Sequence, residues 1–196
     1  MPQNKFSIAS QALVKVGGQP ITGFDDGTTE SDVASVLYED YVRGQIGLVR
    51  WNWAKTQFSL NQNAATPLEG WDYGYDVPSD LLILHRVTIG DNDVKFERFK
   101  DKIFSDEDND SDDLVAHYTY RVDENDWPAD FTLAVITGLA ADFSMSLARE
   151  ADFSTLLEKK AINFFAQARR NDAQGQTPKA VRVGRLTGAR MASAGR

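Results

Sequence analysis

An acidic run at residues 106–113 is the first pattern in the sequence whose residue types and spacing could bind a ligand. From Asp106 an aspartate recurs at every second position, which is the spacing of the first ligands in an EF-hand calcium loop. The glycine that such a loop needs at its sixth position is Ser111, and the bidentate glutamate at its twelfth is His117. The turn residue and the strongest ligand are both missing, so we predict a solvated hairpin loop and no metal site.

The side chains that most often carry catalysis show no catalytic arrangement. His85 and His117 are the only histidines, each lies in a predicted strand, and neither has a nucleophile or an orienting carboxylate beside it in sequence. There is no cysteine, which excludes disulfides and thiolate chemistry. No nucleotide-binding or hydrolase motif is present. We therefore predict no catalytic residue, no metal and no cofactor, and expect both histidines to be structural. Acidic residues are abundant, so a glycosidase with two carboxylates stays open as an alternative.

Five aromatic residues form two groups close together in sequence, namely Trp51 and Trp53, then Trp71, Tyr73 and Tyr75. They could stack on a ligand, but core packing or a subunit interface, where aromatics are enriched, is the favoured interpretation. Alternation would place the last three on one side of an extended chain. We take all five as candidates for subunit contacts.

Charge is unevenly distributed along the chain. The net charge is −8, yet the residues after Asp172 include five basic side chains and no acid, which leaves −13 on residues 1–172. An acidic body of this kind repels phosphates and is a poor nucleic-acid clamp. The basic end could dock on a partner protein, touch nucleic acid or simply remain solvated. The apolar residues between its arginines favour a docked peptide that becomes ordered on binding.

Four segments have the three- and four-residue apolar spacing of helices. They lie at residues 4–16, at about 29–50, from Asp126 to Leu147, and around 153–168. Thr29 and Asp32 have the spacing of a capping box at the start of the second segment. The N-terminus has no apolar leader, and no run approaches the roughly 18 apolar residues of a membrane span. We expect a soluble protein that contacts no membrane.

The middle of the chain alternates between apolar and polar residues, which is typical of strands. The segments that do so are 57–60, 94–99 and 114–122, and the apolar segment 81–89, which follows a turn, is predicted as a buried strand. The predicted fold class is therefore mainly α with a β-rich insertion at about 55–122, comprising a core like a four-helix bundle, a small antiparallel sheet and an extended C-terminal tail. We expect a helical domain over residues 1–172 and a basic tail over 173–196.

The order of several short motifs resembles a known family. The motifs are Ala9-x-x-Ala12-Leu13-x-x-Val16-Gly17-x-x-Pro20-Ile21, Trp51-Asn52-Trp53-Ala54, Trp71-x-Tyr73-x-Tyr75-x-x-Pro78-x-Asp80-Leu81-Leu82, Tyr118-x-x-Arg121 and Trp127-Pro128-x-x-Phe131. Over roughly residues 5–180 the chain resembles the head-to-tail adaptors, or tail tubular proteins A, of short-tailed and related bacteriophages. The acidic stretch 105–113 has no counterpart in that family.

The resemblance implies a structural virion protein and not an enzyme. Such adaptors form rings of twelve copies beneath the portal protein, continue the DNA channel without gripping the DNA, and present a surface to the next tail or nozzle protein. The protein would be made in the host bacterial cytoplasm and end at the portal–tail junction of the virion. The C-terminal extensions of these adaptors lie against the portal. The resemblance assigns that role here to Lys179, Arg182, Arg185, Leu186, Arg190 and Arg196. Two other classes stay open: a peptidoglycan hydrolase with paired carboxylates, and a helical protein-interaction module.

Overall fold

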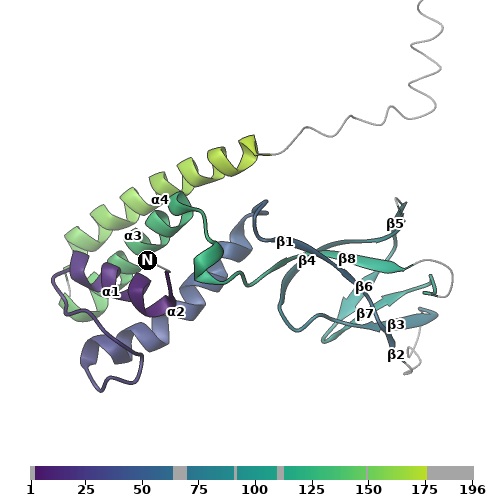
Figure 1. Ribbon diagram of the computed structural model, residues 1–196, viewed down its shortest axis with the longest axis horizontal. Coiled ribbons are helices and arrows are strands. Elements are labelled where there is room, and N and C mark those ends of the chain that lie inside the picture. The colour runs from purple at the N-terminus through teal and green to yellow at the C-terminus, as the bar shows by residue number, and fades with distance from the viewer. Residues whose placement is uncertain (1–2, 64–69, 91, 110–112, 149, 176–196) are drawn as a thin grey trace, which may run out of the picture.

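The computed structural model describes residues 3–63, 70–90, 92–109, 113–148 and 150–175. In this part of the chain the helices gather in one lobe and the strands in another, as Figure 1 shows. The chain passes between the lobes twice, at residues 49–54 and 121–123. The basic residues predicted to bind a portal lie in 176–196, outside the described residues.

The helical lobe contains the four predicted helices. Their bounds are α1 Lys5–Lys15, α2 Thr29–Leu48, α3 Ala129–Phe143 and α4 Ala151–Gln174. The side chain of Asn4 caps α1 by accepting a bond from the Ser7 amide at 2.8 Å. Thr28, and not the predicted Thr29, caps α2 through the Ser31 amide at 3.2 Å. The last helix ends at Gln174, past the domain boundary expected at 172.

Helix α3 is the centre of this lobe, because α1, α2 and α4 all pack against it. It is followed by a π-helical turn, η2, at Ser144–Ala148. By length and hydropathy the stretch Ala129–Leu147 could span a bilayer, and it is the one described helix that could. However, 67% of that stretch is buried inside the fold, as expected for the central helix of a bundle that is apolar on all sides.

The β lobe consists of two four-stranded antiparallel sheets, with strand orders β1-β8-β4-β5 and β2-β3-β7-β6. The strand bounds are β1 Lys55–Ser59, β2 Gln62–Asn63, β3 Tyr73–Asp76, β4 Leu81–Ile89, β5 Asn92–Val94, β6 Glu97–Phe99, β7 Lys102–Ser105 and β8 Leu114–Tyr120. A short 3-10 helix, η1, at Glu124–Asp126 leads back to α3.

The predicted fold class is wrong in its balance. About 48% of the described residues are helical and 23% lie in strands, so the protein is α+β and not a mainly α protein with one small sheet. The segment 94–99, predicted as one strand, divides into the end of β5 and β6, which belong to different sheets. Strands of two to four residues are too short to give a clear alternation, which explains why the second sheet was missed.

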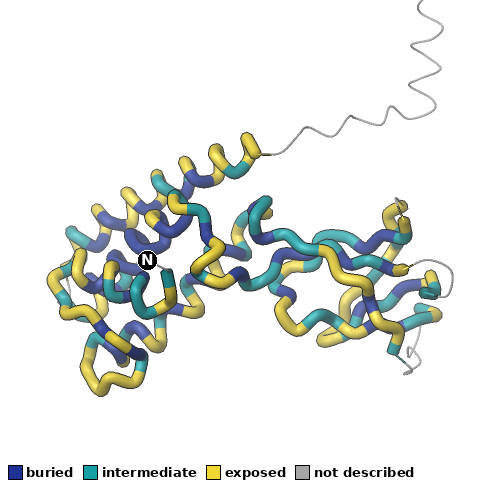
Figure 2. The backbone as a smooth tube through the Cα atoms, viewed as in Figure 1, coloured by how far each residue is buried: buried dark blue, intermediate teal, exposed yellow. Residues whose placement is uncertain are grey.

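Each lobe has its own core, and buried stretches run through both (Figure 2). The β-lobe core takes side chains from both sheets, for example Val87 on β4 and Ile103 on β7, so the two sheets pack face to face. Tyr120, the last residue of β8, packs against both cores. An apolar contact therefore joins the lobes at the point where the chain crosses between them.

Candidate functional site at the junction of the two lobes

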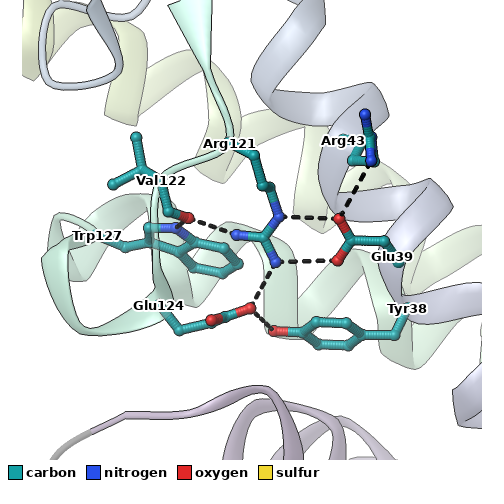
Figure 3. A network of polar contacts seen from close by, with 7 residues as sticks. All are labelled: Tyr38, Glu39, Arg43, Arg121, Val122, Glu124 and Trp127. Carbon is teal, nitrogen blue, oxygen red and sulfur yellow. Dashed lines mark hydrogen bonds and ion pairs between the residues drawn. The ribbon is translucent and has the colours of Figure 1, made fainter. Parts of the chain in front are cut away.

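The residue that follows Tyr120 carries the main polar connection between the lobes. Arg121 lies at the exit of β8 and directs its guanidinium toward α2 (Figure 3). Its Nε and Nη2 atoms donate to the two carboxylate oxygens of Glu39, each at 3.1 Å. Nη2 also donates to Oε1 of Glu124 in η1 at 2.6 Å, and Nη1 donates to the backbone carbonyl of Val122. This two-pronged pairing fixes the orientation of the guanidinium as well as its position.

The network continues into the core of the helical lobe. The Tyr38 hydroxyl donates to Oε1 of Glu124 at 3.1 Å, and the Tyr38 side chain is 1% exposed. Trp127 donates from its indole nitrogen to the Val122 carbonyl at 3.0 Å, and the Arg121 guanidinium lies 5.5 Å from the centre of its ring. One Arg121 side chain thus connects α2, η1 and the start of α3.

The protonation states of Arg121 and Tyr38 are fixed near neutral pH. Burial alone would lower the pKa of Arg121, but its bonds to Glu39 and Glu124 outweigh burial and raise that pKa. Burial raises the pKa of Tyr38, and the Glu124 charge raises it further. Arg121 therefore stays a cation and Tyr38 stays a neutral donor. The arrangement suits holding two lobes in place and not the transfer of a proton.

An open cleft of about 460 Å³ lies beside this network. It contains carboxylates, amides, a lysine and the guanidinium. Its lining residues are Gln3, Asn4, Lys5, Phe6, Glu39, Arg121, Asp123, Glu124 and Asn125. A polar cleft with both signs of charge is suited to a polar segment of a protein partner.

A second polar connection fixes the end of α4. The Asn52 backbone amide donates to both carboxylate oxygens of Asp172, at 2.9 and 3.1 Å, and the Asn52 side-chain amide donates to the Asp172 carbonyl at 2.7 Å. These bonds hold the last turns of α4 against the loop that follows α2. The end of the described chain, Gly175, is therefore held close to the junction of the lobes.

The first group of predicted contact aromatics lies in the helical lobe. Trp51 and Trp53 pack on Phe131, with ring centres 5.1 and 4.7 Å away, and Trp127 and Phe165 contact the same ring. Trp51 is 1% exposed, and its indole nitrogen donates to a backbone carbonyl of α2. Trp51 therefore packs in the core of its own chain, which is the other interpretation that the sequence left open. Trp53 is half-buried.

The second group lies in the β lobe, so the structure does not bring the five aromatics together. Tyr75 is 0% exposed, and its hydroxyl donates to the Glu107 carbonyl at 2.5 Å. Tyr73 and Tyr75 share one side of β3, as the alternation predicts, but that side faces the β-lobe core. Tyr75 is therefore a core residue of its own chain. Trp71 and Tyr73 are half-buried, and the Trp71 indole donates to Glu97 at 3.2 Å.

The structure also shows an acidic pair that the sequence did not single out. Burial raises the pKa of Asp142, at the end of α3, and the charge of Glu158 on α4 raises it further. Tyr41 on α2 lies against the same part of α3, and burial together with Asp142 and Glu158 raises its pKa too. Burial of an acid is not visible from composition, which explains the omission. No group of three or more metal-ligating side chains is present among the described residues.

Most residues of the junction were not predicted from the sequence. Arg121 was noted only as part of the motif Tyr118-x-x-Arg121, and no role was predicted for its neighbours Glu39, Glu124 and Tyr38. The available signal was local: Glu39 and Arg43 have i,i+4 spacing on a helix, and Glu124 follows Arg121 by three residues. No protein-family model matches the chain, and no curated protein is significantly similar to it.

Proposed function

We propose that this protein is a structural ring subunit that joins a bacteriophage portal to the tail and continues the DNA channel. The observation that carries the proposal is the pair of lobes with separate cores, joined by the Arg121 network and by Tyr120. A subunit between a portal, a downstream tail protein and two neighbours must present several surfaces at fixed angles. Two lobes locked to each other meet that requirement.

The C-terminal tail, residues 173–196, is the proposed portal-binding segment. Its basic and apolar side chains suit docking on a partner. The bonds between Asn52 and Asp172 support this role, because they hold the root of the tail at one place on the subunit. A fixed root lowers the entropy lost when the tail becomes ordered on its partner.

The acidic body suits a DNA channel. With −13 on residues 1–172, a ring of such subunits repels phosphates, so DNA can slide through it without being held. The β lobe is the part proposed to contact neighbouring subunits or the downstream tail protein. The mature location is then the portal–tail junction of the virion.

The experiment that tests the proposal is a mass measurement by light scattering, with the protein alone and then mixed with the portal protein of the same phage. We expect the mixture to contain a closed ring of adaptor, roughly 260 kDa if it is twelvefold. A chain that stays near 21.8 kDa in both samples would contradict the proposal and would favour a helical interaction module with another partner.

A hydrolase is the alternative that a specific observation favours. Asp142 and Glu158 supply one acid with a raised pKa beside a second carboxylate, which is the pattern of a glycosidase acid and its partner. A turbidity assay on purified cell walls tests this reading. Clearing by the wild type, and none by Asp142→Asn, would support the hydrolase. No clearing at high protein concentration would dismiss it.

A further inference from the structure

Both histidines lie on the outer face of the β1-β8-β4-β5 sheet. Along β8 the side chains of Leu114, Ala116 and Tyr118 enter the β-lobe core, so those of His117 and Thr119 point to the opposite face. His117 is paired in register with Gln57 on β1 and with Arg86 on β4. This face therefore has a polar row across three adjacent strands, β1, β8 and β4.

A β-bulge brings His85 onto the same face. The β4–β8 register shifts between Leu84 and Arg86, which leaves His85 as the extra residue. Its Nε2 atom lies 2.7 Å from the Thr119 hydroxyl. Such bulges commonly redirect a side chain at a functional surface. Here the bulge places an imidazole at the root of the β lobe, next to the helical lobe.

The surroundings of His85 are positively charged although the whole chain is acidic. Burial lowers the pKa of His85, and the charges of Arg50 and Lys55 lower it further. Arg50 is exposed and makes no ion pair with any described residue. We name Arg50, Lys55 and His85 the basic sheet face.

The acidic run that the sequence predicts as a hairpin loop lies at the other end of β8. It does not close a hairpin, because β7 and β8 belong to different sheets. Asp106, Glu107 and Asp113 are exposed where β7 connects to β8, and we name these three residues the acidic loop. The base of this connection is held by hydrogen bonds. Asn109 accepts from the Leu114 amide at 2.5 Å and donates to the Leu60 carbonyl at 3.1 Å.

One chain cannot pair these two surfaces with each other. They lie at opposite ends of β8, which has 7 residues. At about 3.4 Å per residue, that strand separates them by roughly 20 Å. The distance exceeds the reach of two side chains, and Figure 1 shows the β7–β8 connection at the end of the β lobe away from the helices.

We propose that the basic sheet face of one copy binds the acidic loop of a second copy, so that neighbouring subunits join head to tail. The inference rests on the proposed ring and names the contact between its subunits. Two different surfaces on each copy form a heterologous interface, and such an interface closes into a ring when its rotation allows. Each copy carries −8, so opposite charges at the contact offset the repulsion between copies.

A second copy suits this face better than nucleic acid. A phosphate backbone long enough to follow the face would also pass the acidic surfaces of the same chain, which repel it. A short loop brings its carboxylates to the basic sheet face alone. Binding of nucleic acid to the basic sheet face is therefore the alternative that the test below distinguishes.

The test is a charge exchange read by light scattering with the portal present. Arg50→Glu alone, and Asp106→Arg with Glu107→Arg alone, are each expected to lower ring formation about tenfold or more, since like charges then face each other. All three changes together are expected to restore it. Lys159→Glu, on the exposed side of α4, is the matched control and should assemble as the wild type does.

Several results would overturn the inference. They are normal assembly by both charge-reversed variants, absence of rescue in the combined variant although each is folded by circular dichroism, or loss of duplex DNA binding by Arg50→Glu with assembly unchanged. If the wild type does not join the portal at all, the proposed function fails separately. Sedimentation of the chain alone then decides the inference: self-association that salt and Arg50→Glu both abolish supports it, and its absence overturns it.

Discussion

The two lobes are stabilised in different ways. The helical lobe is organised around α3, and a single ring, Phe131, contacts four other aromatic rings. The β lobe has a smaller core between two sheets of short strands, and polar bonds hold its connections, as Tyr75 and Asn109 do at the β7–β8 connection. Apolar packing is non-directional, whereas hydrogen bonds fix geometry. The difference suggests that the helical lobe supplies most of the stability and the β lobe supplies shaped surfaces.

The junction combines both kinds of interaction. Tyr120 packs on both cores, and the next residue, Arg121, makes the polar network. Four variants test how apolar packing and polar contacts each stabilise the molecule.

Phe131→Ala should break the helical lobe. Phe131 is 0% exposed, so its truncation removes a filled volume at the centre of the aromatic cluster. We expect the free energy of unfolding to fall by about 3–5 kcal/mol. Urea unfolding followed by tryptophan fluorescence measures it, since Trp51, Trp53 and Trp127 all lie in this lobe. A loss below about 1 kcal/mol would contradict a core centred on this ring.

Gly138→Ala tests the packing of α2 on α3. A Cβ at Gly138 would lie 1.6 Å from the Tyr41 hydroxyl oxygen and 2.6 Å from its ring carbon Cζ. We expect a loss of about 2–3 kcal/mol, because the two helices must separate. The matched control is Gly44→Ala in α2, where a Cβ meets nothing within 4 Å. That change should stabilise by up to about 1 kcal/mol, since alanine favours a helix. Equal effects at the two glycines would refute the close contact.

Arg121→Met tests the polar half of the junction. It leaves the Glu39 and Glu124 carboxylates without their cation, and the Arg121 and Glu124 side chains are only 18% and 13% exposed. We expect a loss of about 2 kcal/mol in chemical unfolding. Arg43→Met is the control, because its single contact with Glu39 is 4.0 Å long and both side chains are about half exposed. The control should change stability by less than about 0.5 kcal/mol.

Asp142→Asn tests whether this buried carboxylate makes the stability of the helical lobe depend on pH. Burial and the Glu158 charge raise the pKa of Asp142 above 3.8, so its contribution to stability is present below 3.8 and is lost as pH rises through the folded-state pKa. At neutral pH the amide should therefore raise the melting temperature, and the pH dependence above 3.8 should become flatter. Asp40→Asn, at an exposed position on α2, should leave the melting temperature at neutral pH unchanged. A lower melting temperature for Asp142→Asn at neutral pH would show that the carboxylate has a stabilising partner.

The helices could be predicted from the sequence, and the second sheet could not. Residues such as Phe131, Val135 and Leu139 repeat along one face over many turns, so a helical pattern accumulates evidence locally. A strand such as Lys102–Ser105 has four residues, and its partners in β3 lie about 30 positions away in sequence. Nothing local distinguishes it from a loop.

Some features of the candidate site could likewise be predicted from the sequence, and others could not. Tyr73 and Tyr75 share one side of β3, as the alternation predicts, whereas Trp71 precedes that strand. Alternation does not say which face is covered, and the face that Tyr73 and Tyr75 share is the core. The Arg121 network depends on Glu39, which is 82 positions away, so only the fold brings the two together. Portal binding by the basic residues within 179–196 stays a prediction, because these residues lie outside the described part of the chain.

The central claim is that the two lobes form one rigid subunit, and a distance between them tests it most directly. The chain has no cysteine, so Lys159→Cys on α4 and Lys95→Cys between β5 and β6 give two unique sites for spin labels. Electron–electron resonance should then give one narrow distance distribution, which broadens when Arg121→Met is added. A broad or multiple distribution in the parent protein, unchanged by Arg121→Met, would contradict the account.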